Sequence, residues 1–123
     1  MKKNILLIED NLNNHLLFIR FLERDGHQIT PQINAADALA FIETNEVHLI
    51  ITDYGLPDEN GVEIAKKVRS NPKTSKLPII LITAGTFDAD TRIHQEKVSD
   101  AILSKPIDFP LLRKTVSDLI NRP

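Results

Sequence analysis

Hydrophobic positions along the chain fall into two alternating patterns. The clearest runs are short, rich in branched apolar residues and barely alternating, and they cover 5–8, 47–51 and 78–82. Such runs are typical of parallel strands that are covered on both faces. Two weaker runs, 27–30 and 100–103, predict further strands, and Pro31 directly after the first of them places that strand at a sheet edge.

Helical spacing fills the segments between these runs and after the last one. The fourth helical segment, 88–97, is mostly polar, so Ile93 is its main expected anchor and this helix should be the least firmly held. Asn34 and Asp108 are expected to cap the second and fifth helices. The expected buried stripes are Leu12, Leu16 and Ile19 with Phe18 and Leu22; Ala35, Ala38, Leu39 and Ile42; Ile64, Ala65 and Val68; and Leu112, Val116, Leu119 and Ile120.

The order of these segments is strand and helix, five times over. Parallel strands need crossover helices, and such crossovers are right-handed. The pattern therefore predicts the α/β class: a doubly wound (βα)₅ three-layer sandwich with a five-stranded parallel sheet of order 2-1-3-4-5. Residues 1–123 show no internal repeat, linker or second pattern, so we expect one domain.

Charge and composition narrow the function. The chain has 15 basic and 17 acidic residues, a formal net charge of −2, which lacks the basic footprint of a nucleic-acid-binding protein. Cysteine is absent, which removes disulfides, thiolate catalysis and cysteine-built metal sites. The apolar run at 5–8 is too short for a signal peptide, and no stretch approaches the roughly 20 apolar residues of a membrane span. We therefore expect a cytoplasmic protein without a membrane or nucleic-acid partner.

Polar side chains follow four of the expected strands. Glu9 and Asp10 follow the first, Asp53 the third, Thr83 the fourth and Lys105 the fifth. Taken singly, each is ordinary: a solvated acid or helix cap, a turn hydroxyl, a surface charge. Because the carboxyl ends of parallel strands meet at one edge, the three carboxylates should repel one another unless a cation binds, and carboxylates with water suit Mg²⁺. The lysine and hydroxyl would complete a cradle for a phosphoryl group.

Four motifs in this order resemble the receiver domains of two-component response regulators, the CheY-like domains. They are the acidic pair Glu9–Asp10, the D-x-x-x-P-x-x-x-G pattern over 53–61, Thr83–Ala84 and Lys105–Pro106. The resemblance extends from residue 4 to about residue 121. It implies a flavodoxin-like fold and a single receiver domain over 1–123.

The resemblance also implies roles for the site residues. Asp53 would be the phosphoacceptor that attacks the phosphohistidine of a sensor histidine kinase or a histidine phosphotransfer protein. Lys105 and Thr83 would contact oxygens of the phosphoryl group. In this family the peptide bond between Lys105 and Pro106 is cis.

The expected cofactor is Mg²⁺, or another divalent cation such as Mn²⁺. By resemblance, Asp10, Asp53 and the backbone carbonyl of Gly55 would hold it. Glu9, which stands where the family usually has aspartate, would act largely through water. Such a protein assists its own phosphorylation and dephosphorylation and is not a metabolic enzyme.

The expected output is a switch of the surface formed by the fourth helix, the fifth strand and the fifth helix, which would bind a downstream protein. Thr83 and Ile102 are the expected switch residues, although the family often has tyrosine or phenylalanine at the position of Ile102. We expect a monomer or weak dimer.

Two alternatives remain at this point. The first is a receiver-like module that binds a partner without phosphorylation, which Ile102 favours slightly. The second is a haloacid-dehalogenase-type phosphatase, which the missing second aspartate of a D-x-D motif at Gly55 disfavours.

Overall fold

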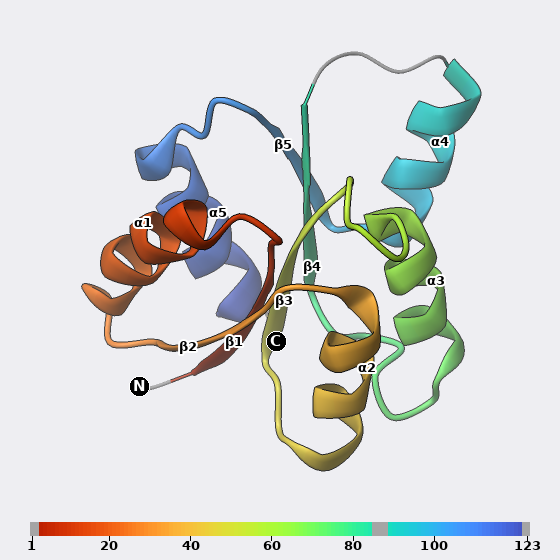
Figure 1. Cartoon of the computed structure of the whole chain (residues 1–123), viewed down its shortest axis with the longest axis horizontal. Coiled ribbons are helices and arrows are strands. Elements are labelled where there is room, and N and C mark those ends of the chain that lie inside the picture. Colours follow the sequence, from red (N-terminus) through yellow and green to blue (C-terminus); the bar gives the residue numbers. More distant parts are fainter. Residues whose placement is uncertain (1–2, 85–88, 122–123) are drawn as a thin grey trace.

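Five parallel strands form one sheet in the order β2-β1-β3-β4-β5 (Figure 1). The computed structural model describes residues 3–84 and 89–121, apart from the side chains of residues 89–91 and 94. Strand and helix alternate throughout, so the predicted fold class and strand order are confirmed. The elements are β1 (Asn4–Ile8), α1 (Leu12–Glu23), β2 (Gln28–Gln32), α2 (Ala35–Thr44), β3 (Leu49–Asp53), α3 (Gly61–Ser70), β4 (Ile79–Thr83), α4 (Ala89–Val98), β5 (Ala101–Ser104) and α5 (Phe109–Ile120).

Both faces of the sheet are covered, which explains why the central strands are apolar without alternation. Helices α1 and α5 lie on one face, and α2, α3 and α4 lie on the other (Figure 1). Successive residues of β1 point to opposite faces: Ile5 and Leu7 pack with α1 and α5, whereas Leu6 and Ile8 pack with α2 and α3. The sheet is therefore the middle of three layers, and it separates two apolar cores.

Strand β2 is an edge strand, as Pro31 predicted. The strand continues through Pro31 to Gln32, which is longer than the sequence pattern indicated. Gln28 donates its N–H to the carbonyl of Lys3, and Gln32 accepts from the N–H of Glu9, so the even-numbered residues pair with β1. The nitrogen of Pro31 therefore faces away from the sheet, where its missing hydrogen costs no ladder bond.

Helix α1 buries only part of the predicted stripe, which included Phe18 and Leu22. Leu12 and Leu16 are 66% and 56% exposed, whereas His15, Phe18 and Leu22 are buried. His15, Phe18 and Leu22 have helical spacing, and Leu12, Leu16 and the half-buried Ile19 lie on the adjacent part of the helix surface. Phe18 packs edge-on against Phe109 of α5, with ring centroids 5.7 Å apart. Aromatic contact between the two helices thus decides which stripe faces the core.

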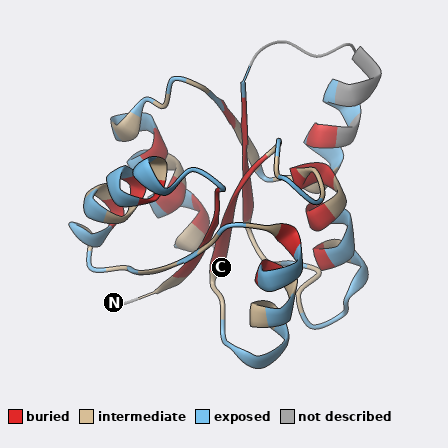
Figure 2. Ribbon diagram, viewed as in Figure 1, coloured by how far each residue is buried: buried red, intermediate tan, exposed pale blue. Residues whose placement is uncertain are grey.

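Helix α4 also differs from the prediction. Ile93, the expected anchor, is 51% exposed, whereas Gln95 is fully buried. Figure 2 shows the strands of the sheet as mostly buried and the described part of α4 as partly exposed. Neither polar atom of the Gln95 amide has a hydrogen-bond partner among the described residues. The helix lies beside α3 and β5, and Val98 at its end packs against the core on this face of the sheet.

The remaining helices follow the sequence closely. Asn34 and Asp108 cap α2 and α5, each accepting a backbone N–H from the residue three positions on. The predicted stripes of α3 and α5 are buried, except that Ile120 is half-buried. Among the described helices, none is long and apolar enough to cross a bilayer.

Candidate functional site

Three carboxylates meet at the carboxyl end of the sheet. Glu9, Asp10 and Asp53 each offer an oxygen, and these oxygens lie within 4.8 Å of one another. A cavity at this edge is lined by all three, together with Asn11, Asn14, Tyr54, Gly55, Ala84 and Lys105. The structure therefore brings together the acidic residues that the sequence placed after separate strands.

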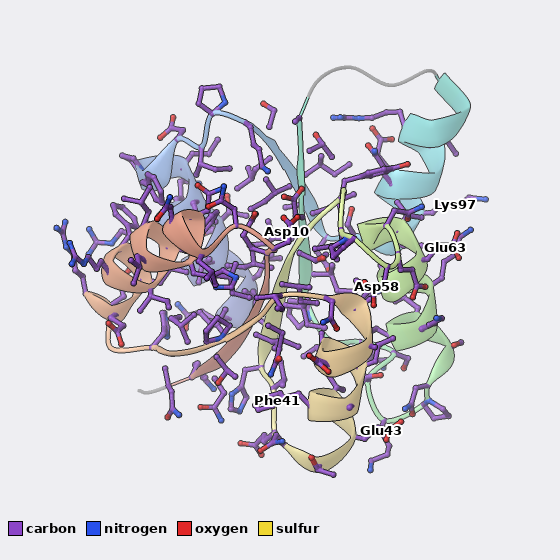
Figure 3. The ribbon with its side chains drawn as sticks, in the orientation of Figure 1. Asp10, Phe41, Glu43, Asp58, Glu63 and Lys97 are labelled. Carbon is purple, nitrogen blue, oxygen red and sulfur yellow. The ribbon has the colours of Figure 1, made fainter. Side chains whose placement is uncertain are left out.

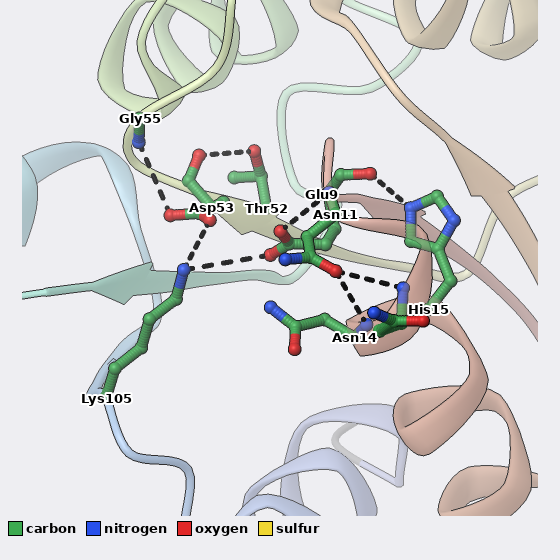
Figure 4. Close-up of polar contacts among 9 residues, drawn as sticks. Glu9, Asn11, Asn14, His15, Thr52, Asp53, Gly55 and Lys105 are labelled. Carbon is green, nitrogen blue, oxygen red and sulfur yellow. Dashed lines mark hydrogen bonds and ion pairs between the residues drawn. The ribbon is translucent and has the colours of Figure 1, made fainter.

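Asp53 is the last residue of β3 and is buried, with 6% of its surface exposed. One carboxylate oxygen accepts a hydrogen bond from the Gly55 N–H at 3.3 Å. The other accepts one from the Lys105 ammonium at 2.6 Å (Figure 4). Thr52 donates its hydroxyl to the Asp53 carbonyl at 3.0 Å. The carboxylate is thus held from both sides at the floor of the cavity.

Glu9 is almost completely buried beside these charges. Burial raises its pKa from 4.5 to about 7, and a side-chain hydrogen bond with Asp53 adds to the rise. The Asn11 N–H, which donates to Glu9 at 3.1 Å, and the charge of Lys105 oppose it. A carboxyl that resists ionisation next to two others marks a place where negative charge is under-compensated.

Among the described residues that line the cavity, Lys105 is the one with a positively charged side chain. Its Nζ lies 2.6 Å from Asp53 and 3.9 Å from Glu9. Burial lowers the pKa of Lys105, but the hydrogen bond and charge of Asp53, together with the charges of Glu9 and Asp10, outweigh burial, and the net direction is upward. Its backbone N–H donates to the Thr83 carbonyl at 2.8 Å, and its peptide bond to Pro106 is cis, as the resemblance implied.

The loop after Asp53 needs a glycine at position 61. A Cβ there would lie 2.6 Å from the Asp53 carbonyl oxygen and 2.7 Å from a methyl group of Leu81. The Gly61 N–H donates to the Tyr54 carbonyl at 2.8 Å, and Gly55 pairs with Asn60 in an antiparallel bridge. The loop therefore folds back tightly, and the start of α3 lies against the end of β3.

Two other predicted site residues lie near this edge. Thr83 ends β4 and is buried, with 1% of its surface exposed. Ile102 is half-buried in β5 and pairs with Leu81 of β4. Their roles as switch residues stay predictions, because they concern a second state of the molecule.

The donor set suits a hard divalent cation. Carboxylate oxygens within 4.8 Å of one another, with no sulfur donor, match the ligands that Mg²⁺ and Mn²⁺ prefer. The raised pKa of Glu9 also fits, since a cation would offset the burial and the neighbouring negative charge that together oppose its ionisation. The residues present therefore fit a metal of this kind.

Sequence reasoning gave little weight to the residues that support the acidic pair. The Nε2–H of His15 donates to the Glu9 carbonyl (Figure 4). Asn11 caps α1 by accepting the N–H groups of Asn13 and Asn14 at 2.9 and 3.3 Å. Asn11 immediately follows the pair, and asparagine is a favoured N-cap, so this signal was present in the sequence.

Comparison with known proteins gives the class. A family model for the response regulator receiver domain matches residues 5–117. The chain belongs to this family, and it is a receiver domain of the two-component response regulators. The polar-differentiation response regulators DivK of Brucella anthropi and Brucella ovis are 28% and 27% identical over 120 residues, which cover 98% of this chain and 98% of theirs.

Solved structures agree with this fold. A candidate response regulator from Chloroflexus aurantiacus has a TM-score of 0.91 and 25% identity, covering 99% of this chain and 100% of that one. The receiver domain of a sensor histidine kinase from Pseudomonas aeruginosa, solved with a magnesium ion in its active-site cleft, has a TM-score of 0.88 and 24% identity, with 99% and 100% covered.

Proposed function

We propose that this receiver domain accepts a phosphoryl group on Asp53 from a phosphohistidine of a sensor histidine kinase or a histidine phosphotransfer protein. One observation carries the proposal: the buried Asp53 carboxylate lies 2.6 Å from the Lys105 ammonium, among carboxylates that suit a divalent cation. The family to which the chain belongs, and the magnesium ion in the Pseudomonas relative, support it.

In the transfer step a carboxylate oxygen of Asp53 attacks the phosphorus in line with the bond to the histidine nitrogen. The new O–P bond gives an aspartyl phosphate, and the breaking P–N bond leaves its electron pair on the imidazole. Lys105, already beside Asp53, stays close to the transferred oxygens and balances their charge. Thr83 is proposed to donate its hydroxyl to another phosphoryl oxygen.

The proposed cofactor is Mg²⁺ or Mn²⁺, held by Asp10, Asp53 and the Gly55 carbonyl, with Glu9 acting through water. When bound, this ion supplies positive charge that draws the phosphoryl oxygens toward the carboxylates. Alignment and charge balance are most of what a loose phosphoryl-transfer transition state requires from a protein.

The output is proposed to be a population shift of the surface formed by α4, β5 and α5, which then binds a downstream protein. Thr83 and Ile102 would carry the shift. Ile102 has no hydroxyl or ring, so the change there would be a repacking of an aliphatic side chain. The proposal includes a cytoplasmic location, where the phosphohistidine donor can reach Asp53.

Incubation with acetyl phosphate and Mg²⁺, followed by intact-mass measurement, tests the proposal. We expect one added phosphoryl group in the wild type and none in Asp53→Asn or in wild type with EDTA. No added group, together with no Mg²⁺-dependent binding of beryllofluoride, would overturn the proposal and favour a module that binds partners without phosphorylation.

A further inference from the structure

A carboxylate from the loop after Asp53 caps a helix that is distant in sequence. Asp58 accepts the N–H of Ala35 at 2.9 Å and the N–H of Ala36 at 3.1 Å, one on each oxygen. Figure 3 shows Asp58 beside the beginning of α2, on the side facing α3. These two hydrogen bonds link segments 22 and 23 residues apart.

Helix α2 also has a cap of its own. Asn34 accepts the N–H of Asp37 at 2.8 Å. The first three N–H groups of α2 are thus satisfied by two side chains, one local and one from the loop. The Ala35 hydrogen bond lowers the pKa of the Asp58 carboxyl, as does the Ala36 bond. A carboxylate is also favoured electrostatically at the positive end of the helix dipole.

Other contacts fasten the loop to β3, β4 and α3. The Tyr54 N–H donates to the Ile82 carbonyl of β4 at 2.8 Å. The Gly61 N–H donates to the Tyr54 carbonyl, and Gly55 pairs with Asn60. Glu59 forms an ion pair with Lys67 of α3 at 2.9 Å. Among the contacts described for residues 54–60, the Asp58 carboxylate is the hydrogen-bonded link to α2.

We propose that Asp58 is a positioning residue for the phosphorylation site, acting by fixing the 54–60 loop to the beginning of α2. The loop begins directly after Asp53, and its Gly55 N–H donates to the Asp53 carboxylate. Fixing the loop at Asp58 keeps the Gly55 backbone beside that carboxylate. This inference rests on the proposed function where it concerns Mg²⁺.

Two substitutions separate this role from simple capping. Asp58→Ala and Asn34→Ala each remove a side-chain acceptor from the same helix end, so both should lower the stability of α2. Only Asp58→Ala also removes the two hydrogen bonds between the loop and α2. Asp58→Asn keeps one oxygen acceptor for the two N–H groups and should fall between Asp58→Ala and the wild type.

Two readouts apply to the full chain. Amide hydrogen exchange of the 54–60 segment in metal-free protein should be faster in Asp58→Ala than in Asn34→Ala or wild type. Mg²⁺ affinity, measured by calorimetry or by the fluorescence of Tyr54, should weaken roughly three- to tenfold in Asp58→Ala and less than about twofold in Asn34→Ala. Tyr54 is the only tyrosine, there is no tryptophan, and Tyr54 lines the cavity, so its signal reports on the site.

Unchanged hydrogen exchange of the loop and unchanged Mg²⁺ affinity in Asp58→Ala would overturn the inference. Equal changes in Asp58→Ala and Asn34→Ala would also overturn it, because Asp58 would then act only as a helix cap. If Asp58→Ala does not fold, Asp58→Asn against Asn34→Ala gives the same contrast at reduced size. A wild type that does not bind Mg²⁺ would contradict the proposed function, and the exchange comparison would still decide the role of Asp58.

Discussion

The middle and the carboxyl end of each central strand bury different kinds of side chain: aliphatic ones in the middle and ionisable ones at the end. In β1, Ile5 to Ile8 are buried among aliphatic side chains, and the next residue, Glu9, is equally buried but ionisable. In β3, Ile51 is fully buried, and Asp53 is 6% exposed beside a lysine. The buried aliphatic residues of these strands therefore stabilise the fold, whereas the buried ionisable residues at their carboxyl ends lower its stability.

The two regions also differ in the interactions that stabilise their buried side chains. An aliphatic side chain in the middle packs against its apolar neighbours. Its burial contributes about 1.5–3 kcal/mol to the free energy of unfolding, independently of pH. Lys105 compensates the charge of the carboxylates at the end only in part. Burial, with a smaller contribution from Asp53, raises the pKa of Glu9 to about 7. Stability of the strand middles should not depend on ligand or pH, whereas stability of the strand ends should depend on both.

The largest expected effect is in the strand middle. Ile51→Ala should lower the free energy of unfolding by about 3–4 kcal/mol, because it removes a fully buried side chain and leaves a cavity. Urea unfolding monitored by circular dichroism measures this. The loss should be the same with Mg²⁺ and with EDTA, and a loss that changed markedly between them would break the distinction between middle and end.

The second expected effect is a dependence of the free energy of unfolding on pH, caused by Glu9 at the end of β1. The folded state holds the Glu9 proton more tightly than the unfolded state, with a pKa of about 7 against 4.5. The resulting stabilisation is complete below about pH 4.5 and is lost as the pH rises through 7. In EDTA, raising the pH from 5 to 8 should therefore lower the free energy of unfolding through Glu9 by about 1–3 kcal/mol.

Glu9→Gln is the matched control for this dependence. His27 acts in the opposite direction, because burial lowers its pKa from 6.5 and its contribution rises with pH. The difference between wild type and Glu9→Gln removes that background, since both contain His27. Parallel pH profiles for the two proteins in EDTA would contradict the raised pKa of Glu9.

The smallest effect concerns Asp53 itself. In EDTA, Asp53→Asn should raise the free energy of unfolding by about 1 kcal/mol, since it removes one of three crowded carboxylates. Lys105 loses a partner at 2.6 Å, but Glu9 at 3.9 Å remains available to it. With Mg²⁺ the order should reverse, because only the wild type keeps the full set of proposed ligands. Thermal melts in EDTA and in Mg²⁺ measure the direction of the change in each condition. Destabilisation by both Asp53→Asn and Asp53→Ala in EDTA would show that the ion pair between Lys105 and Asp53 outweighs the repulsion among the carboxylates.

The sequence predicted features that depend on the strands alone. Apolar runs predicted the strands, and their alternation with helices predicted the doubly wound strand order. The carboxyl ends of those strands identified Glu9, Asp10, Asp53 and Lys105 as neighbours. Features that depend on particular contacts between helices or loops were predicted only in part. The buried stripe of α1 depends on Phe109 of α5, and α4 buries Gln95 in place of Ile93.

The contact of Asp58 with α2 belongs to the same group, because it joins the loop after β3 to the beginning of a helix that is distant in sequence. Local sequence identifies Asn34 as the cap of α2. It gives no sign that a second cap arrives from a loop more than 20 residues away.

Strand β2 has a further consequence for how molecules of this protein meet at high concentration. An exposed strand edge is a template on which another chain can add a strand. At this edge the outward-facing backbone nitrogen of Pro31 carries no hydrogen, and its ring occupies the place where a partner carbonyl would approach. An edge interrupted in this way discourages sheet-to-sheet aggregation while leaving the inner side of β2 paired with β1.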